Sequence, residues 1–328
     1  MRRLLKSLLL LMALAVDGQC AEPPITSLAF SPDGQTLLAT SQAGVQLRDW
    51  PSLKLRQTIS CSSPNLNDIA FSPDGSSFAV GGGSPAVDGI VEVFSWPQAV
   101  SQSVLRPNSD SIASVTWIDD TMLAAASLDH QVVIANAQSS EVIHRIDGHS
   151  RGVLAVAALA SSHQIVTVGI DFSLRVWDAK QGSLVHGLSI HTAPVTRLAL
   201  RPGDHALPMI ASASEDRTAR LWQPTIGRMV RFVRLESVPI DIEWTSDGSQ
   251  LIAACADGHL RVIDPDSVEV TNDLAVSDDW IYALAVNPSG EAVVTGDAKG
   301  TVKHISIETI LGRFNENSSA DSDAEVIK

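Results

Sequence analysis

The sequence predicts an all-β protein, a seven-bladed β-propeller of four-stranded antiparallel blades. Two segments carry the motif Ser-Pro-Asp-Gly, at residues 31–34 and 72–75, each directly after a short alternating strand. Proline fixes φ at the first corner of a turn and Asp-Gly supplies a tight reversal, so each motif predicts a hairpin. Short apolar runs broken by Gly, Pro, Asp and Ser recur along the chain, whereas helical heptads are absent.

The hairpins belong to a repeat that runs through the chain. The last inward residue of each predicted first strand recurs every 41 to 46 residues or so, close to the length of one propeller blade; these residues are Phe30, Phe71, Trp117, Ala158, Leu200, Trp244 and Val286. Two steps are longer than the others. We expect a flexible loop over residues 81–89 in the second unit and a longer loop over residues 201–209 in the fifth.

Closure of the ring is the weakest part of the predicted fold. A single four-stranded unit cannot bury both of its faces, but a closed ring of such units covers each face with a neighbour. The last strand of the seventh unit is predicted from about Glu308 to Phe314. The segment before Ile25 contains Pro23-Pro24 and is too short to supply that strand.

Units four and five resemble WD repeats. Unit four contains Gly148-His149, the strand 165–169, Asp171 and the run 174–178 that ends in Trp-Asp. Unit five has the same order of His, Ser, Asp and Trp. The resemblance covers residues 25–310, is strong in these two units and weaker in the other five. Together with the N-terminal export signal described below, it indicates an exported, bacterial-type member of the WD-repeat (WD40) family.

In that family a His, a strand Ser or Thr, a turn Asp and a third-strand Trp form a hydrogen-bonded tetrad. The resemblance therefore implies two structural tetrads, His149, Thr167, Asp171 and Trp177 in unit four, and His191, Ser212, Asp216 and Trp222 in unit five. A buried imidazole held by a carboxylate and a hydroxyl fits this role chemically. Units three and six have Ala135 and Ile263 at the Trp position, and units one, two and seven lack the His, so we expect no complete tetrad there.

Catalysis and metal binding are disfavoured by the sequence. The tetrads contain the residue types of a hydrolase triad, but no Gly-x-Ser-x-Gly elbow is present. The glycine run at 81–83 precedes a strand rather than the helix that a phosphate cradle needs. His130, His259 and His304 are scattered over separate units, and no Cys-x-x-Cys occurs. We expect no enzyme activity, no cofactor and no metal site.

The N-terminal residues have the pattern of an export signal. Arg2, Arg3 and Lys6 precede an apolar stretch over residues 4–16 that is too short to span a bilayer, which needs about 20 residues. We expect a signal peptide over residues 1–20, a propeller over 21–314 and a disordered acidic tail over 315–328. The expected location is the periplasm or the extracellular space. A lipoprotein acylated at Cys20 and an uncleaved anchor remain as less favoured alternatives.

Composition narrows the class of partner. The formal net charge is −14, and an acidic surface repels nucleic acids and anionic lipids. Beyond Cys20 only Cys61 and Cys255 remain, and the repeat places them too far apart to bridge. We expect a monomer that has no membrane span, does not bind nucleic acid and binds a protein or a peptide.

Alternation of strands along the repeat decides which loops share a face of the ring. The Ser-Pro-Asp-Gly turns lie at one end, and the loops carrying His149 and His191 lie at the other, with the turns between second and third strands. In WD-repeat proteins the latter face commonly receives protein partners, which nominates Arg151, Phe172, Glu215, Arg217, Asp279, Trp280 and Tyr282. The loop over residues 81–89 would open on this face and gate it.

Two functions are compatible with the sequence. The favoured one is a protein-binding scaffold that is not an enzyme and acts in the cell envelope or outside the cell. The alternative is a propeller enzyme, or a small-ligand or metal binder, that uses the central channel. The innermost strands are dominated by Ala, Leu, Val, Ile, Ser and Thr, which argues against that alternative. For Trp280 and Tyr282, packing against a neighbouring blade is an equally good interpretation.

The distribution of tetrads predicts unequal rigidity around the ring. Backbone amides in blade four should exchange with solvent more slowly than those in blade seven, because only the former has a complete polar network. Hydrogen exchange followed by mass spectrometry measures this directly. Faster exchange in blade four than in blade seven would contradict the prediction.

Overall fold

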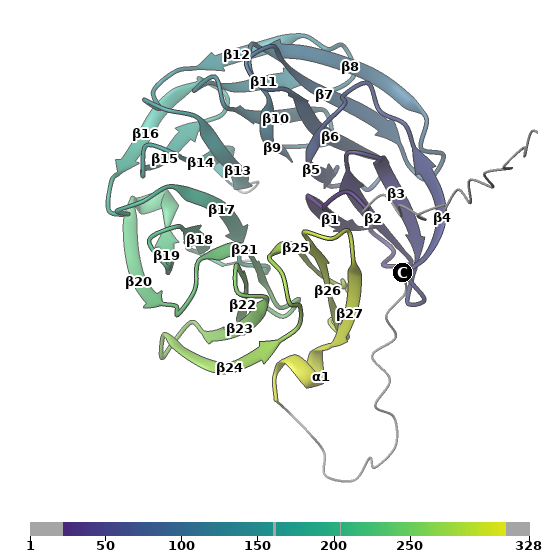
Figure 1. Cartoon of the computed structure of the whole chain (residues 1–328). Coiled ribbons are helices and arrows are strands. Elements are labelled where there is room, and N and C mark those ends of the chain that lie inside the picture. Colours follow the sequence, from purple (N-terminus) through teal and green to yellow (C-terminus); the bar gives the residue numbers. More distant parts are fainter. Residues whose placement is uncertain (1–21, 160–161, 204, 313–328) are drawn as a thin grey trace, which may run out of the picture.

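The computed structural model describes residues 22–159, 162–203 and 205–312, which form seven antiparallel sheets around a central axis (Figure 1). The predicted seven-bladed propeller is confirmed. Six blades have four strands, and the seventh has three among the described residues. The predicted signal peptide and the predicted tail over 315–328 lie outside the described residues.

Each blade follows the same strand order from the axis outward. The first strands line the axis and are β1 (Ser27–Phe30), β5 (Leu66–Phe71), β9 (Ile112–Trp117), β13 (Val153–Leu159), β17 (Val195–Leu200), β21 (Pro239–Trp244) and β25 (Ile281–Val286). The second strands are β2 (Thr36–Ser41), β6 (Ser77–Ser84), β10 (Met122–Ser127), β14 (Gln164–Gly169), β18 (Ile210–Ser214), β22 (Leu251–Cys255) and β26 (Ala292–Asp297).

The outer strands complete the blades. The third strands are β3 (Gly44–Asp49), β7 (Asp88–Ser95), β11 (Val132–Asn136), β15 (Leu174–Asp178), β19 (Thr218–Gln223), β23 (His259–Asp264) and β27 (Val302–Ser306). The fourth strands are β4 (Lys54–Ile59), β8 (Ser101–Asn108), β12 (Val142–Ile146), β16 (Ser183–Leu188), β20 (Arg228–Arg234) and β24 (Glu269–Ala275). A short 3-10 turn, η2 (Pro224–Ile226), precedes β20.

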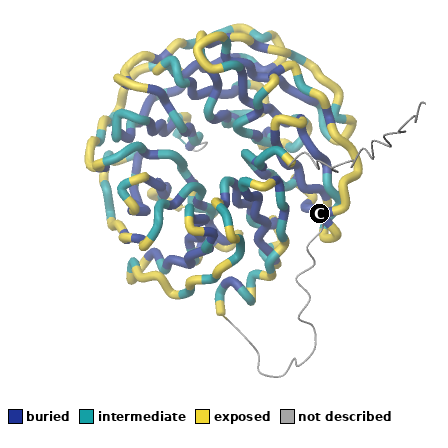
Figure 2. Tube along the Cα trace, viewed as in Figure 1, coloured by how far each residue is buried: buried dark blue, intermediate teal, exposed yellow. Residues whose placement is uncertain are grey.

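The core lies between the blades rather than within any one of them. Second strands such as β2 are buried along their whole length, whereas fourth strands such as β4 are exposed at all but one residue. Figure 2 shows this gradient from the buried inner strands to the exposed rim. The repeat residues of the sequence fall at or next to the ends of the first strands. Leu200 departs from the prediction, because it is 39% exposed where the loop over 201–209 replaces a tight turn.

The predicted last strand of blade seven is wrong within the described residues. Residues Ile307–Ile310 form a short helix, α1, instead of the start of a strand. Ser306 stops β27 and caps this helix, since its hydroxyl accepts a hydrogen bond from the N–H of Thr309. Ile310 then packs into the core between blades six and seven.

Blade one closes the ring by packing against blade seven. Ile25 is 1% exposed, and its N–H donates to the carbonyl of Asp297 at 3.2 Å. Ile25 and Leu28 share an apolar cluster with Ala283, Ala285 and Val294. Figure 1 shows β1 and β25 side by side at the axis. Burial of apolar surface, with this one backbone bond, therefore joins the two ends of the repeat.

The glycine run of blade two is not the flexible loop that was expected. Gly81, Gly82 and Gly83 lie in β6 and pair with residues 89–91 of β7, so the hairpin is extended and ordered. A Cβ atom on Gly82 would lie 1.9 Å from the carbonyl oxygen of Asn65. The glycines therefore let a neighbouring backbone approach closely, and they do not form a gating loop.

The two cysteines of the propeller are free, as expected from the repeat. Cys255 is buried in the core between blades five and six, and Cys61 is half-buried between blades one and two. Burial raises the pKa of the Cys61 thiol to about 12 and that of Cys255 to about 11. Neither thiol is a reactive nucleophile at neutral pH.

The close approach at Gly82 predicts a large cost for adding one carbon there. Gly82→Ala should lower the free energy of unfolding by at least about 2 kcal/mol, because the Asn65 backbone must move. Gly187→Ala on the exposed strand β16 is the control, since its Cβ would meet only the tip of Leu184 at 4.0 Å. Urea denaturation compares the two variants, and an equal cost in both would refute the packing argument.

Candidate functional site

The loop before β13 is fastened to the turn after β14 by a buried polar network. His149 places Nδ1 3.0 Å from Asp171 Oδ1 and Nε2 2.8 Å from Thr167 Oγ1. The indole N–H of Trp177 donates to the same Thr167 hydroxyl at 2.8 Å. Ser150 adds a backbone N–H to Asp171 Oδ2 at 3.0 Å. The four side chains thus connect a loop, a turn and two strands of blade four.

Blade five contains the same arrangement. His191 lies 2.8 Å from Asp216 through Nδ1 and 2.8 Å from Ser212 through Nε2. Trp222 is fully buried, and its indole N–H donates to Ser212 Oγ at 2.8 Å. The hydroxyls of Thr167 and Ser212 belong to residues with 0% exposure. A substrate cannot reach them, so these groups hold the blade together and do not form a nucleophile with its base.

The charge states of the network follow from its surroundings. Burial lowers the pKa of both His149 and His191, although each Asp partner opposes the shift. Burial acts against ionisation of Asp171, but hydrogen bonds from Ser173 and Arg175 outweigh it and hold the pKa of that carboxyl well below its usual range. The imidazoles are therefore neutral and the carboxylates charged at pH 7.

Two other blades keep a reduced form of the same loop-to-turn contact. Asn108 Nδ2 donates to both oxygens of Asp129 at 3.0 Å, and Ser277 Oγ donates to Asp297 Oδ2 at 3.1 Å. Asn108 and Ser277 stand four residues before the first residue of β9 and of β25, the position that His149 and His191 occupy before β13 and β17. Sequence reasoning looked for His alone at this position and missed both contacts.

A second pairing that the sequence reasoning missed joins each turn Asp to an Arg four residues later. It occurs in three successive blades, as Asp171–Arg175 at 2.7 Å, Asp216–Arg220 at 3.2 Å and Asp257–Arg261 at 2.7 Å. Arg261 is 2% exposed and also contacts Asp273 of β24 at 3.0 Å. The spacing Asp-x-x-x-Arg is present in the sequence of all three blades and could have predicted this pairing.

The predicted partner-binding residues lie at one end of the ring. The loops before first strands meet the turns after second strands there, through backbone bonds from Ile170 to Gly152, Glu215 to Pro194 and Ala298 to Trp280. Trp280 is 48% exposed and contacts Tyr282 edge-on, with ring centroids 6.0 Å apart. Of the other predicted residues, three are exposed and two half-buried; the exposed ones are Arg151, Glu215 and Arg217, and the half-buried ones Phe172 and Asp279.

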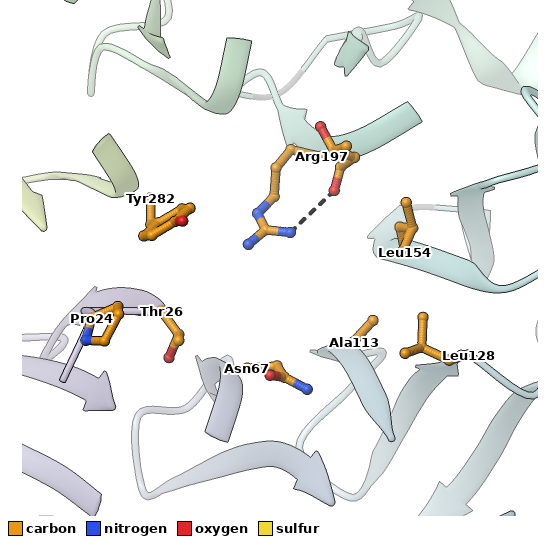
Figure 3. Close-up of a pocket in the computed structure, with 9 residues that line it drawn as sticks. Pro24, Thr26, Asn67, Ala113, Leu128, Leu154, Arg197 and Tyr282 are labelled. Atoms are coloured by element: carbon orange, nitrogen blue, oxygen red, sulfur yellow. Dashed lines mark hydrogen bonds between the residues drawn. The ribbon is translucent and has the colours of Figure 1, made fainter. Parts of the chain in front are cut away.

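A cavity of about 470 Å³ opens at this end, at the mouth of the central channel. Residues near the starts of six innermost strands line it, namely Thr26, Asn67, Ala113, Leu154, Thr196 and Tyr282. Figure 3 shows Arg197 and Tyr282 pointing toward the open centre. The apolar side chains of Leu128 and Leu154 lie across the open space from them. Asn67 Nδ2 bridges blades two and three by donating to the carbonyl of Ile112 at 2.7 Å.

The innermost strands, which the sequence predicts to be dominated by apolar and hydroxyl side chains, also carry charged residues that the prediction did not single out. Asp68 Oδ2 accepts the N–H of Val115 in blade three at 2.9 Å, and Asp241 Oδ2 accepts that of Leu284 in blade seven at 2.8 Å. Each carboxylate thus satisfies a backbone donor on the unpaired edge of the next blade. Arg197 lies 3.6 Å from Asp241.

Glu243 shares the channel with these groups. Burial and repulsion from Asp241 and Asp68 raise the pKa of Glu243 to about 8. Burial also raises the pKa of Asp241 to about 6, against the attraction of Arg197. Glu243 is therefore mostly protonated at neutral pH.

The histidines considered for a metal site are not brought together. His259 pairs with Asp273 on the rim of blade six, His304 contacts Trp50 with ring centroids 4.7 Å apart, and His130 is exposed in a turn. Within residues 22–312, outside the three undescribed positions, no group of three or more His, Cys, Asp or Glu side chains could hold a metal ion.

The raised pKa of Glu243 determines the direction in which stability changes with pH. Because its folded pKa lies above its unfolded value, ionisation opposes folding, and stability falls as pH rises from about 4.5 to about 8. Glu243→Gln should therefore raise the melting temperature at pH 9 relative to the unaltered chain, with little gain at pH 4.5. Calorimetry at both pH values tests this, with exposed Glu291→Gln as control. An equal change at both pH values would contradict the argument.

Comparison with protein families supports the repeat. The family described as WD domain, G-beta repeat matches residues 15–45, 53–95, 140–178, 182–223 and 236–264, together more than half of the chain. The matches leave out most of the third unit and all of the seventh, where the sequence pattern is weaker.

The chain is also similar to parts of longer proteins. The chain is 25% identical over 222 residues to telomerase protein component 1 of Mus musculus, covering 62% of this chain and 8% of that protein. It is 25% identical over 248 residues to anaphase-promoting complex subunit cdc20 of Dictyostelium discoideum, covering 71% of this chain and 49% of that protein.

A third relative is WD repeat-containing protein VIP3 of Arabidopsis thaliana, 28% identical over 206 residues that cover 57% of this chain and 64% of that protein. The chain thus spans less than two thirds of the length of each of these relatives. On the family match and the seven-bladed fold, the chain belongs to the WD40 repeat family.

Proposed function

We propose that the chain is a protein-binding scaffold, not an enzyme, which receives a protein or peptide partner at the mouth of its central channel. The observation that carries this proposal is the half-exposed Trp280, which stands with Tyr282 beside the cavity of about 470 Å³. Aromatic side chains next to a pocket are typical of binding hot spots, and the charged residues Arg151 and Arg217 are exposed at the same end of the ring.

The relatives support a role in assembly. Two of them are named as parts of larger complexes, a telomerase component and a subunit of the anaphase-promoting complex. Members of this family typically act as interaction scaffolds. The buried hydroxyls of Thr167 and Ser212 add a reason to set enzyme activity aside, since a hydrolase needs an accessible nucleophile.

The setting we propose is the periplasm or the extracellular space, for an exported, bacterial-type chain. The support is the basic and apolar N-terminal stretch of the sequence, with the predicted cleavage after residue 20. Between residues 22 and 312, apart from the undescribed positions, the structure contains no helix long and apolar enough to cross a bilayer. The net charge of −14 favours a protein partner over nucleic acid. We propose that the chain acts as a monomer.

A second candidate, small-ligand binding in the channel, is favoured by one specific observation. Arg197 and Tyr282 both face the cavity, and apolar side chains such as Leu128 and Leu154 line it across the open space (Figure 3). Such a mixture of one cation, a few hydroxyl and amide groups and apolar walls is common in ligand pockets. Equilibrium dialysis against small carboxylic acids and divalent metals separates this candidate from a protein scaffold.

The binding face predicts which substitutions abolish partner capture. Trp280→Ala combined with Arg151→Ala should reduce recovery of a specific partner from an envelope fraction at least about tenfold, because an aromatic anchor and a charge are lost together. Affinity capture with the purified variants, followed by quantitative mass spectrometry, provides the measurement.

The matched control lies on the opposite end of the ring. Gln35→Ala combined with Glu291→Ala alters two exposed side chains in turns between first and second strands. This double variant should capture the same partners as the unaltered chain. The face assignment is wrong if the control loses partners, or if the Trp280 and Arg151 variant keeps all of them.

A further inference from the structure

The charge of the chain is unevenly distributed around the ring. Blade five, residues 195–234, contains seven arginines, no lysine and three acidic residues, which gives it a formal charge of +4. Since the whole chain carries −14, the remainder carries −18. Three of the seven arginines lie on one strand, β20, at the outer rim of the blade (Figure 1). Blade five is thus a basic sector of an acidic protein.

The exposed side chains of β20 form a surface that we call the arginine stripe, made up of Arg228, Arg231, Phe232 and Arg234. The arginines recur at every third residue, so the stripe extends about 20 Å along the strand, at about 3.3 Å per residue. Phe232 among them is 50% exposed. Guanidinium groups bind carboxylates well, and an exposed aromatic ring binds an apolar side chain.

Contacts with neighbouring strands hold parts of the stripe in place. The guanidinium of Arg220, on the adjacent strand β19, lies 5.5 Å from the centroid of the Phe232 ring and supports it. Arg231 donates to the carbonyl of Pro265 at 3.3 Å and also to the carbonyl of Asp266, both in the turn between β23 and β24. Side chains that are already oriented lose less entropy when a partner binds.

Blade six shows that the stripe is not a general property of the repeat. Its third-strand arginine, Arg261, pairs across the strands with Asp273, whereas Arg220 of blade five pairs across the strands with Phe232. The fourth strand of blade six, β24, contains two acidic residues and no basic one. At the same place in its blade, β20 contains three arginines and no carboxylate. A carboxylate from another molecule can supply the negative charge that β20 lacks.

The carboxylate of Asp266 does not neutralise the stripe. Its Oδ1 lies 3.7 Å from Arg231, but the Asp266 side chain is 93% exposed. An exposed ion pair at this distance contributes little to stability, so a partner can replace it. Arg228 and Arg234 pair across the strands with uncharged residues of β19. The stripe therefore keeps an excess of positive charge.

We propose that the arginine stripe binds an extended acidic segment of a protein partner, with carboxylates on the three arginines and an apolar side chain on Phe232. A segment of about seven residues matches the length of the stripe. A peptide is favoured over a membrane or a nucleic acid because the basic surface is only one blade wide. Blade six beside it, residues 239–275, has one arginine and eight acidic residues, which repel a broad polyanion.

Fluorescence anisotropy with synthetic peptides tests the proposal on the full chain. The labelled probe is the acidic peptide Glu-Glu-Leu-Glu-Glu-Leu-Glu-Glu, and its uncharged counterpart has Gln in place of every Glu. The acidic probe should bind at least about tenfold more tightly than the uncharged peptide. Its affinity should fall at least about fivefold when the salt concentration rises from about 50 to about 200 mM.

Substitutions in the stripe should weaken binding in two distinguishable ways. The triple variant Arg228→Gln, Arg231→Gln and Arg234→Gln should bind the acidic probe at least about tenfold more weakly, because the carboxylates lose their partners. Phe232→Ala should weaken the same probe about fivefold, but should not change the binding of a probe with Ser in place of both Leu residues. That difference separates a lost contact from a disturbed strand, and circular dichroism checks that each variant is folded.

A charge-matched control removes three positive charges elsewhere on the rim. Lys54→Gln, Arg56→Gln and Arg106→Gln alter exposed side chains on the fourth strands of blades one and two. This control has the same net charge as the stripe variant, so only the position of the charges differs. It should bind the acidic probe as tightly as the unaltered chain does.

Four outcomes would overturn the proposal. Equal losses in the two triple variants would reduce the effect to overall charge. Equally tight binding of the uncharged peptide would remove the role of the arginines. Phosphatidylserine vesicles or duplex DNA that bind through the stripe, when the peptide does not, would assign the surface to a membrane or a nucleic acid. Probe binding that appears only after deletion of residues 315–328 would assign it to the chain itself. None of these measurements depends on the channel mouth, so they are independent of the proposed function.

Discussion

Each blade must bury both of its faces against its neighbours, and the rest of the structure follows from that constraint. Alternate residues of one second strand serve two separate cores: Leu123 and Ala125 face blade two, while Ala124 and Ala126 face blade four. All four are at most 1% exposed. Burial of apolar area contributes about 25 cal/mol per Å². An isolated blade leaves both apolar faces in water and gains none of this, so a single blade is not stable and the ring must close.

The sequence was sufficient for the architecture because turns and spacing depend on local chemistry. Pro-Asp-Gly corners and the blade-length period placed all seven first strands, although only two units carry the full polar pattern. The errors arose where tertiary contacts decide. Gly81 to Gly83 suggested flexibility, but the closeness of Asn65 to Gly82 is visible only in the folded hairpin. Likewise Ser306 acts as a helix cap, which no periodicity indicated.

Only part of the candidate site could be predicted from the sequence, because some of its residues come together only in the folded ring. Exposed residues such as Trp280 could be assigned to a face, because strand alternation fixes which loops share it. The channel charges were not recognised as a group, because Asp68 and Asp241 are far apart in the chain, on blades two and six, and come near each other only in the closed ring. Alignment of the repeats would have shown both at the same position of their first strands, with Arg197 between them.

The turn aspartates explain why loops with different residues reach the same geometry. In blades three, four and five the residue after the Asp has a positive φ, at His130, Phe172 and Arg217. Each Asp accepts the backbone N–H two residues on, which fixes its carboxylate toward the preceding loop. Any donor in that loop can then bond to it, whether His149, His191 or Asn108. The polar contact thus sets the shape of this end of the ring, and the exposed loop residues are free to differ from blade to blade.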